Sequence, residues 1–473
     1  MSLNSIMGYP SVDDLVHVAH GMARRHPKAI RLRRLGSSRA GDPLLLLTVG
    51  HGARNVLLVA GAHANEPVGG ATSLRLAELL LGGSGGTIGT AAGGGLLEDS
   101  DCSWHFLLCL DPDGSRLNGD WLHGLPGVRE YFHGFYRPLF ASQPEFLPAP
   151  GEKRRPLPES EILLALLDEL RPEFQFTLHG SEMGGAFVQA TRAVPGLVDA
   201  VREVSAALSI PVDLRPFDGI DWHVSGPGVL VLPEPDTVRE RDPSGLITGT
   251  TWLYPARYGT VTVILEAPAW AVEAVADPAP YPDPEKAIAE AGENLLQRIG
   301  QVAGLLALAD EWNGAVNDPF LPAVRELVAV SPGVVETWLK PGFRYADGTR
   351  PAATRGSAAA LLIAARRIAL RAAAMLDRSL RAAPGPGAAK ARLGLDDLVT
   401  EWCREFEAEF APRAVPVRDQ AELQARLALH CVARVLGPRV LGPPPADRQE
   451  PTRRRPAAWH RGHPARPPLE GTS

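Results

Sequence analysis

A histidine and a glutamate three residues apart, His63 and Glu66, form the first pair in the sequence whose types could bind a metal. They lie in the stretch GAHANEP, directly after the apolar run Asn55 to Ala60, which predicts a strand. At the end of a strand that leads into a helix, both side chains can turn toward one point, where imidazole nitrogen and carboxylate oxygen would bind zinc. The alternative is a surface histidine beside a glutamate favoured by a helix N-terminus.

A third ligand is expected from another strand end, because a catalytic zinc has three protein ligands and one open position. His179 fits this requirement: it follows the apolar run Phe174 to Leu178 and begins the polar turn HGSE. Gly180 would let backbone and substrate approach closely. The alternative for His179 is a hydrogen-bonded residue that caps a strand. We expect one zinc ion per chain.

A zinc hydrolase also needs a base that takes a proton from water and gives it to the leaving amine. Glu266 fits this role, because it ends the apolar run Val261 to Leu265 and Ala267-Pro268 stops the strand directly afterwards. A carboxylate at that position lies at the mouth of the sheet. The alternative is an exposed glutamate at a strand end.

Positive and hydrogen-bonding partners for an oxyanion or an anionic substrate are expected in DPDGSRLN, just after the strand predicted over Trp104 to Leu110. Arg116 carries a planar fork of donors that suits a carboxylate or a tetrahedral oxyanion, and Asn118 lies two residues later. Taken alone, the motif is also compatible with an ordinary turn.

The elements that must position these residues are predicted from apolar periodicity. Strand-like and helix-like stretches alternate over the first 305 residues, which indicates an α/β sheet with helices on its faces. The expected helices are Ser11 to Arg25, Pro67 to Leu81 and Glu159 to Leu170, and the remaining strands are Leu44 to Val49 and Gly259 to Leu265. The glycine-rich stretch Gly82 to Gly95 lacks a phosphate-loop ending and is expected to be a surface loop.

Beyond about residue 305 the pattern becomes helical, with Pro-Gly breaks between the segments. These segments are Phe320 to Val330, Gly356 to Ala383, Leu395 to Phe410 and Gln420 to Val435. We therefore expect a catalytic domain over 1–305, a C-terminal all-α appendage over 306–440, and a disordered tail rich in proline and arginine over 441–473.

The amino-acid composition limits which kinds of molecule the protein is expected to bind and where in the cell it is expected to be. Hydrophobic residues make up 45% and charged residues 22% of the chain, and the net charge of -6 argues against a nucleic-acid-binding protein. The most apolar window, Ala358 to Leu376, contains three arginines that would make insertion into a bilayer costly. No secretory signal precedes Pro10, and the four cysteines have no metal-knuckle spacing. We expect a cytoplasmic protein without nucleic-acid or membrane partners; homo-oligomerisation is left open.

Four segments in this order resemble the zinc carboxypeptidase family, the carboxypeptidase A-like metallopeptidases: GAHANEP, DPDGSRLN, FTLHGSEMGG and TVTVILEAP. The resemblance covers about residues 45 to 270. It implies a mixed, largely parallel sheet flanked by helices, with the site at the carboxyl ends of strands. By residue, it implies His63, Glu66 and His179 as zinc ligands, Glu266 as general base, Arg116 as the group that polarises the scissile carbonyl or clamps a substrate carboxylate, and Asn118 as a substrate-binding residue.

The sequence departs from the family pattern at two places. Members usually carry an Asn-Arg pair that binds the terminal carboxylate of the substrate, and no such pair follows Asn118, so Arg129 or Arg137 is the candidate helper. The usual tyrosine that folds over the substrate is also not obvious. Tyr254 and Tyr258 are the candidates.

Three functions are compatible with these residues. The first is hydrolysis of a C-terminal peptide amide bond by zinc-activated water. The second is deacylation of an N-acyl amino acid, as in the succinylglutamate desuccinylase and aspartoacylase branch that the fold also resembles. The third is an inactive binding module. An open groove would favour a peptidase, whereas a closed pocket with several arginines would favour a deacylase.

Overall fold

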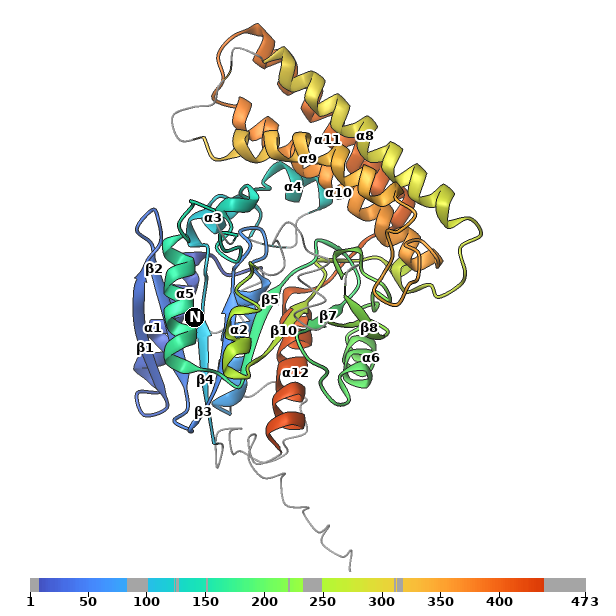
Figure 1. Cartoon of the computed structure of the whole chain (residues 1–473). Coiled ribbons are helices and arrows are strands. Elements are labelled where there is room, and N and C mark those ends of the chain that lie inside the picture. The colour runs from blue at the N-terminus through green and yellow to red at the C-terminus, as the bar shows by residue number, and fades with distance from the viewer. Residues whose placement is uncertain are drawn as a thin grey trace, which may run out of the picture.

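The computed structural model describes residues 8–82, 101–122, 124, 127–149, 152–219, 222–232, 249–309, 312 and 318–437. Within these residues, a nine-stranded mixed sheet has the order β1-β2-β4-β3-β5-β10-β7-β9-β8 (Figure 1). The strands are β1 Ile30–Ser37, β2 Pro43–Val49, β3 Arg54–Ala60, β4 Cys102–Leu107, β5 Phe174–His179, β7 Phe187–Ala190, β8 His223–Gly226, β9 Val229–Val231 and β10 Val261–Glu266.

The four central strands, β4, β3, β5 and β10, run parallel to one another, and β2 and β7 pair with them antiparallel on the two sides. Their register places the carboxyl ends at one edge, since Ala60 of β3 pairs with Leu178 and Glu266 of β10 pairs with His179. The expected α/β class, with a mixed sheet, is therefore confirmed. This register also brings three of the predicted site segments to the same edge.

Helices cover both faces of the sheet because the strand side chains alternate between two apolar cores. In β3, Val56 and Leu58 belong to the larger core, whereas Leu57 and Val59 pack with leucines of α5 on the opposite face. The flanking helices are α1 Val12–Arg25, α2 Val68–Leu80, α5 Pro158–Leu170, α6 Leu197–Ala207 and α12 Val417–Leu436.

Four long helices form a bundle beyond the sheet, at the top of the view in Figure 1. They are α8 Pro284–Leu308, α9 Phe320–Leu339, α10 Arg355–Leu380 and α11 Pro386–Phe410, and the short helices α3 Pro112–Arg116 and α4 Val128–His133 lie between them and the sheet. The expected C-terminal helical region is thus confirmed. Helix α8 runs across residue 305, and the division of the chain into domains stays a prediction.

The chain after the bundle returns to the sheet. Strand β12, Arg413–Ala414, pairs with β11, Trp270–Ala271, which pairs in turn with β6, Met183–Gly184. Helix α12 then packs against α2. Residues 83–95 of the expected glycine-rich loop and the expected tail at 441–473 lie outside the described residues. Among the helices that the structure describes, none combines the length and apolarity needed to cross a membrane.

Gln424 of α12 satisfies backbone groups at the end of the sheet. Its side-chain amide donates to the carbonyl oxygens of His179, at 2.6 Å, and Leu265, at 2.8 Å, and accepts a hydrogen bond from Thr72 at 2.6 Å. Gln424 is fully buried. Since buried carbonyls without a donor are costly, the C-terminal helix supports the strand ends that carry the site.

Gln424→Met is expected to lower the free energy of unfolding by about 2 to 4 kcal/mol, because two buried carbonyl groups lose their donor without a large change in volume. Denaturant unfolding of the full chain measures this loss. The control is Arg426→Met on the same helix, which removes only a partly exposed ion pair with Glu422 and should cost less than about 1 kcal/mol. Equal stability of the two variants would contradict the supporting role.

Candidate metal centre and its pocket

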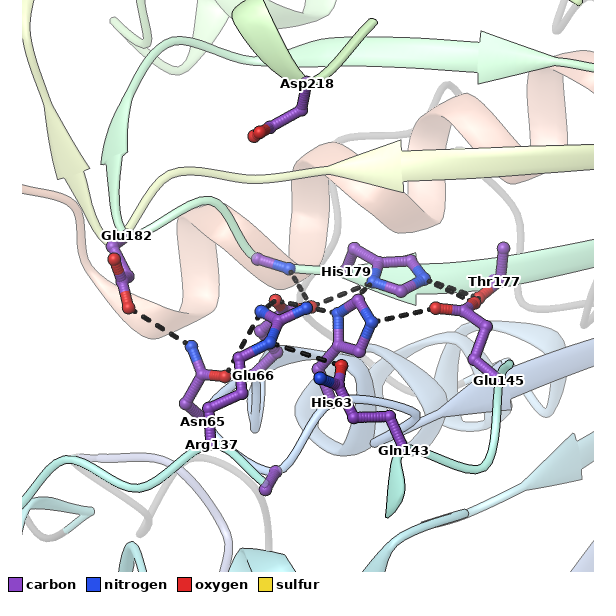
Figure 2. A network of polar contacts seen from close by, with 12 residues as sticks. His63, Asn65, Glu66, Arg137, Gln143, Glu145, Thr177, His179, Glu182 and Asp218 are labelled. Carbon is purple, nitrogen blue, oxygen red and sulfur yellow. Dashed lines mark hydrogen bonds and ion pairs between the residues drawn. The ribbon is translucent and has the colours of Figure 1, made fainter. Parts of the chain in front are cut away.

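His63, Glu66 and His179 converge at the carboxyl ends of β3 and β5 (Figure 2). The Nδ1 atom of His63 lies 3.0 Å from Oε1 of Glu66, and the Nδ1 atom of His179 lies 2.9 Å from Oε2. The two Nδ1 atoms are 3.1 Å apart. All three side chains are buried. The structure thus brings together the three residues that the sequence predicted as ligands.

Close backbone packing places the loop between β3 and α2. Gly61 has φ +61°, and a Cβ atom there would lie 2.8 Å from Sγ of Cys109. Gly69, in the first turn of α2, would place a Cβ atom 3.0 Å from the carbonyl oxygen of Leu178 in β5. These glycines let α2 start directly against the strands, so that Glu66 faces the residue that ends β5.

The donor set fits a zinc ion. Two imidazole nitrogens and a carboxylate that each lie about 2.0–2.2 Å from a tetrahedral zinc would be about 3.3 Å from one another. The observed separations of 2.9 to 3.1 Å are close to this value. The Nδ1 atoms of His63 and His179 cannot both carry a hydrogen at this separation, because the two hydrogens would point at each other. Two unprotonated Nδ1 atoms can instead direct their lone pairs at one cation.

Glu145 is a further buried carboxylate at this centre, and no motif in the sequence indicates it. It lies on the other side of the two imidazoles, with Oε1 3.2 Å from Nε2 of His179 and Oε2 2.9 Å from Nε2 of His63. Thr177 and Trp252 also donate to Oε1. Ligand atoms of His63, Glu145 and His179 all lie within 4.8 Å of one another, so this group is geometrically able to hold a metal as well.

The charges of this cluster favour a divalent cation. Burial alone would raise the pKa of Glu66, but His63 and His179 hold it well below its ordinary value. Burial likewise opposes ionisation of Glu145, yet His179 and His63 hold its pKa below the ordinary range. Both carboxylates are therefore ionised, and in turn Glu145 and Glu66 raise the pKa of His179 well above its ordinary value against the effect of burial. A Zn²⁺ ion would supply positive charge in place of that proton, because an imidazole binds a metal in its neutral form.

Glu266 lines the same pocket at the end of β10. Burial raises the pKa of its carboxyl group to about 8, with contributions from the negative charges of Glu66 and Asp218, while His179 and Arg367 act in the opposite direction. A carboxylate with a raised pKa is a stronger base than an ordinary glutamate. Its position beside the candidate ligands is the one that the sequence predicted.

The pocket has a volume of about 340 Å³ and combines an aromatic part with a charged part. Phe140, Phe146, Trp222 and Trp252 form the aromatic lining. The charged lining beyond the metal centre consists of Arg137, Asp218, Glu266, Arg367 and Arg371. Three arginines therefore reach the pocket, two of them from α10.

Arg116 and Asn118 lie away from this pocket. The Arg116 guanidinium is paired with Asp13, at 2.8 Å, and with Asp42, at 2.7 Å, on the surface. Asn118 is fully buried: its amide donates to the carbonyl of Tyr136 at 2.9 Å and accepts from the N–H of the same residue at 2.9 Å. In this structure the two residues hold loops together, and they do not line the cavity.

Tyr254 and Tyr258 also do not line the pocket. Their hydroxyl groups donate to Asp168 of α5 at 2.9 and 2.7 Å on the outer surface. Arg129 pairs with Asp396 at 3.4 Å. Of the candidate helpers, only Arg137 reaches the centre, where Nη1 lies 3.0 Å from Oε1 of Glu66.

A protein-family model matches the part of the chain that contains two of the three candidate metal ligands. Residues 15–124, which include His63 and Glu66, match the model of the zinc carboxypeptidase family. A search of curated proteins finds no match to this chain.

Three solved structures of low sequence identity are among those similar to the chain. A metallo-carboxypeptidase from Burkholderia cenocepacia is 17% identical, with a TM-score of 0.35, 54% of this chain and 59% of that chain covered. Bovine thrombin-activatable fibrinolysis inhibitor is 14% identical, with a TM-score of 0.35 and coverages of 55% and 87%. Carboxypeptidase A from Helicoverpa armigera is 13% identical, with a TM-score of 0.34 and coverages of 56% and 66%.

Proposed function

We propose that this chain is a zinc-dependent hydrolase that cleaves an amide bond, with His63, Glu66 and His179 as the metal ligands and Glu266 as the general base. The observation that supports this proposal most strongly is the convergence of the three ligands and Glu266 in one pocket, although they come from segments up to 203 residues apart. The match of residues 15–124 to the zinc carboxypeptidase model supports it independently.

The residues divide the chemistry between them. Zinc, when bound, supplies a Lewis acid and lowers the pKa of a water molecule. Glu266 accepts a proton from the attacking water and then gives it to the leaving amine, for which its raised pKa is suited. Arg137, next to Glu66, is placed to stabilise negative charge that develops on the carbonyl oxygen.

Glu145 acts as an outer partner of the two histidines in this proposal. A histidine that binds metal through one ring nitrogen commonly donates its other N–H to a carboxylate, which fixes its tautomer. Glu145 faces both Nε2 atoms, at 2.9 and 3.2 Å, while the Nδ1 atoms face Glu66. One carboxylate thus lies beside both imidazoles and shares a hydrogen bond with His179.

Glu145→Gln is expected to weaken zinc affinity by about 10- to 100-fold, because it removes the carboxylate that shares a hydrogen bond with His179 and the negative charge that lies beside His63. Glu66→Gln should weaken it further, since it replaces a ligand. Competition with a chromophoric chelator measures both affinities. If Glu145→Gln lost more zinc affinity than Glu66→Gln, Glu145 would be the ligand and the assignment would be reversed.

The substrate is proposed to be an amide whose amine side is an amino acid with a free carboxylate. The C-terminal bond of a peptide meets this description, and hydrolysis of that bond is the leading proposal. An N-acyl amino acid meets it as well, and the three arginines in the pocket favour this second candidate. The third alternative, an inactive binding module, is expected to lack a ligand or the base, and it is disfavoured because His63, Glu66, His179 and Glu266 line one pocket.

Release of amino acids from a length series separates these candidates. The zinc-loaded chain is given N-acetyl-phenylalanine, an N-acetylated dipeptide and an N-acetylated pentapeptide that all end in phenylalanine. A peptidase should cleave the two peptides with the higher kcat/KM, whereas a deacylase should prefer the single amino acid. If neither class were cleaved by protein with zinc bound, the hydrolase proposal would be rejected in favour of the binding module.

A further inference from the structure

Helix α10 of the C-terminal bundle forms part of the pocket wall. Arg367 and Arg371 lie one helical turn apart, and both line the cavity that contains His63, His179 and Glu266. Their side chains are only 11% and 15% exposed. The bundle therefore contributes two buried cations to a site whose other residues come from the sheet.

The partners of these arginines leave N–H groups free. Nε of Arg371 donates to Oε1 of Glu182 at 3.0 Å, while Nη1 and Nη2 have no hydrogen-bond partner among the described residues. In Arg367, Nη2 donates to Asp218 at 3.1 Å and Nη1 is likewise without a described partner. Since both residues line the cavity, these unused donors are available to a ligand there.

Arg137 adds a third guanidinium group to the lining of the pocket. It donates from Nη1 to Glu66 at 3.0 Å and from Nε to Gln143 at 3.3 Å, and its Nη2 has no described partner. The three groups are close enough to repel one another: burial, together with the charges of Arg367 and Arg137, lowers the pKa of Arg371, although Glu182 acts against this. Gathered like charges with unused donors are the arrangement that binds an anion.

We propose that Arg371 and Arg367 of α10, together with Arg137, bind the carboxylate of the substrate, and that the C-terminal bundle is thereby the specificity-determining wall of the active site. This inference rests on the proposed function for the identity of the reaction, but it concerns binding. The aromatic lining formed by Phe140, Phe146, Trp222 and Trp252 suits an apolar side chain attached to the same substrate.

Another arginine of α10 attaches the bundle to neighbouring loops outside the pocket. Arg378, on the same helix, donates from Nη1 to the backbone carbonyls of Leu117, at 2.7 Å, and Gly134, at 2.6 Å, outside the pocket. It therefore supplies a matched control: an arginine of α10 that holds the bundle in place and does not line the cavity.

The test is calorimetric binding of 3-phenylpropanoate and its neutral analogue 3-phenylpropan-1-ol to the zinc-loaded full chain. Both probes carry a phenyl ring, and neither contains an amide. Arg371→Gln should weaken binding of the carboxylate by about 10- to 100-fold and change binding of the alcohol by less than about threefold. Arg378→Gln should leave the ratio of the two affinities unchanged, because it only affects docking.

Two results would overturn the proposal: equal carboxylate affinity in the wild type and Arg371→Gln, or an equal loss in Arg378→Gln. If Arg371→Gln fails to fold because Glu182 loses a partner, the double variant Glu182→Gln/Arg371→Gln restores the charge balance and should show the same loss. Wild-type affinity in that double variant also overturns the proposal. Because the probes bind without being hydrolysed, a chain that cleaves no amide can still pass this test.

Discussion

Glu266→Gln is expected to lower kcat by about 10²- to 10⁴-fold while the zinc content stays that of the wild type. The amide of glutamine has nearly the same shape as the carboxylate but cannot accept the proton from the attacking water. Because Glu266 lines the pocket without contacting the histidines through a hydrogen bond among the described residues, its replacement should leave the ligands in place. Hydrolysis assays and elemental analysis of the same preparation measure both quantities.

The matched control for this prediction is Glu273→Gln. Glu273 is a nearby glutamate whose side chain is 77% exposed and lies 3.6 Å from Arg413. Its replacement should leave kcat within about twofold of the wild type. Full activity of Glu266→Gln would show that another group acts as the base.

His179→Ala is expected to remove the metal site. The variant loses a direct ligand, so its zinc affinity should fall by more than the roughly 100-fold that the loss of an outer partner can cause. Hydrolysis should fall with it. Chelator competition and activity titration with added zinc measure the two effects.

His105→Ala controls for the loss of a buried histidine. His105 is buried in β4, where Nδ1 lies 3.0 Å from the hydroxyl of Thr48 and Nε2 lies 2.9 Å from Oδ1 of Asn55, and it does not line the pocket. Its replacement should lower stability but leave zinc affinity unchanged. Undiminished zinc affinity in His179→Ala would remove His179 from the ligand set.

The residues that the sequence predicted well are those attached directly to buried strands. His63, Glu66, His179 and Glu266 all follow or end apolar runs that are recognisable without a structure. The carboxyl ends of parallel strands lie on the same side of a sheet. Apolar runs in the sequence, together with this property of parallel sheets, are therefore sufficient to predict that the four residues lie close together. The strand β1 and the helices α6 and α8 were not predicted, although both helices bury apolar residues at helical spacing.

The residues that the sequence did not reveal reach the site through long-range packing. Glu145 lies between the 3-10 turn Phe140–Ser142 and helix α5, in a segment without strand or helix periodicity. In the sequence, the arginines of α10 appear only as charges within an apolar helix, and these charges argue against a membrane-spanning segment. Their role depends on where the bundle packs, and no local motif encodes that position.

Arg116 illustrates the opposite case, in which a local motif was recognised but the side-chain direction was not. The residue ends the short helix α3, and its guanidinium extends to the surface because Asp13 and Asp42 lie there to pair with it. Arg137, 21 residues further along the chain, lines the pocket instead, where its Nη1 lies 3.0 Å from Oε1 of Glu66. The sequence indicates Arg137 only as one of two candidate helpers, beside Arg129, and favours Arg116 for the main role.

The number of zinc ions bound per full-length chain tests the central claim most directly. The protein is stripped with a chelator, dialysed against zinc and analysed for metal, and hydrolysis is followed in the same samples. The structure predicts about one zinc per chain, with hydrolysis lost on stripping and regained in proportion to the zinc returned. A chain that takes up no zinc, or one whose hydrolysis is indifferent to stripping, would contradict the metal centre at His63, Glu66 and His179.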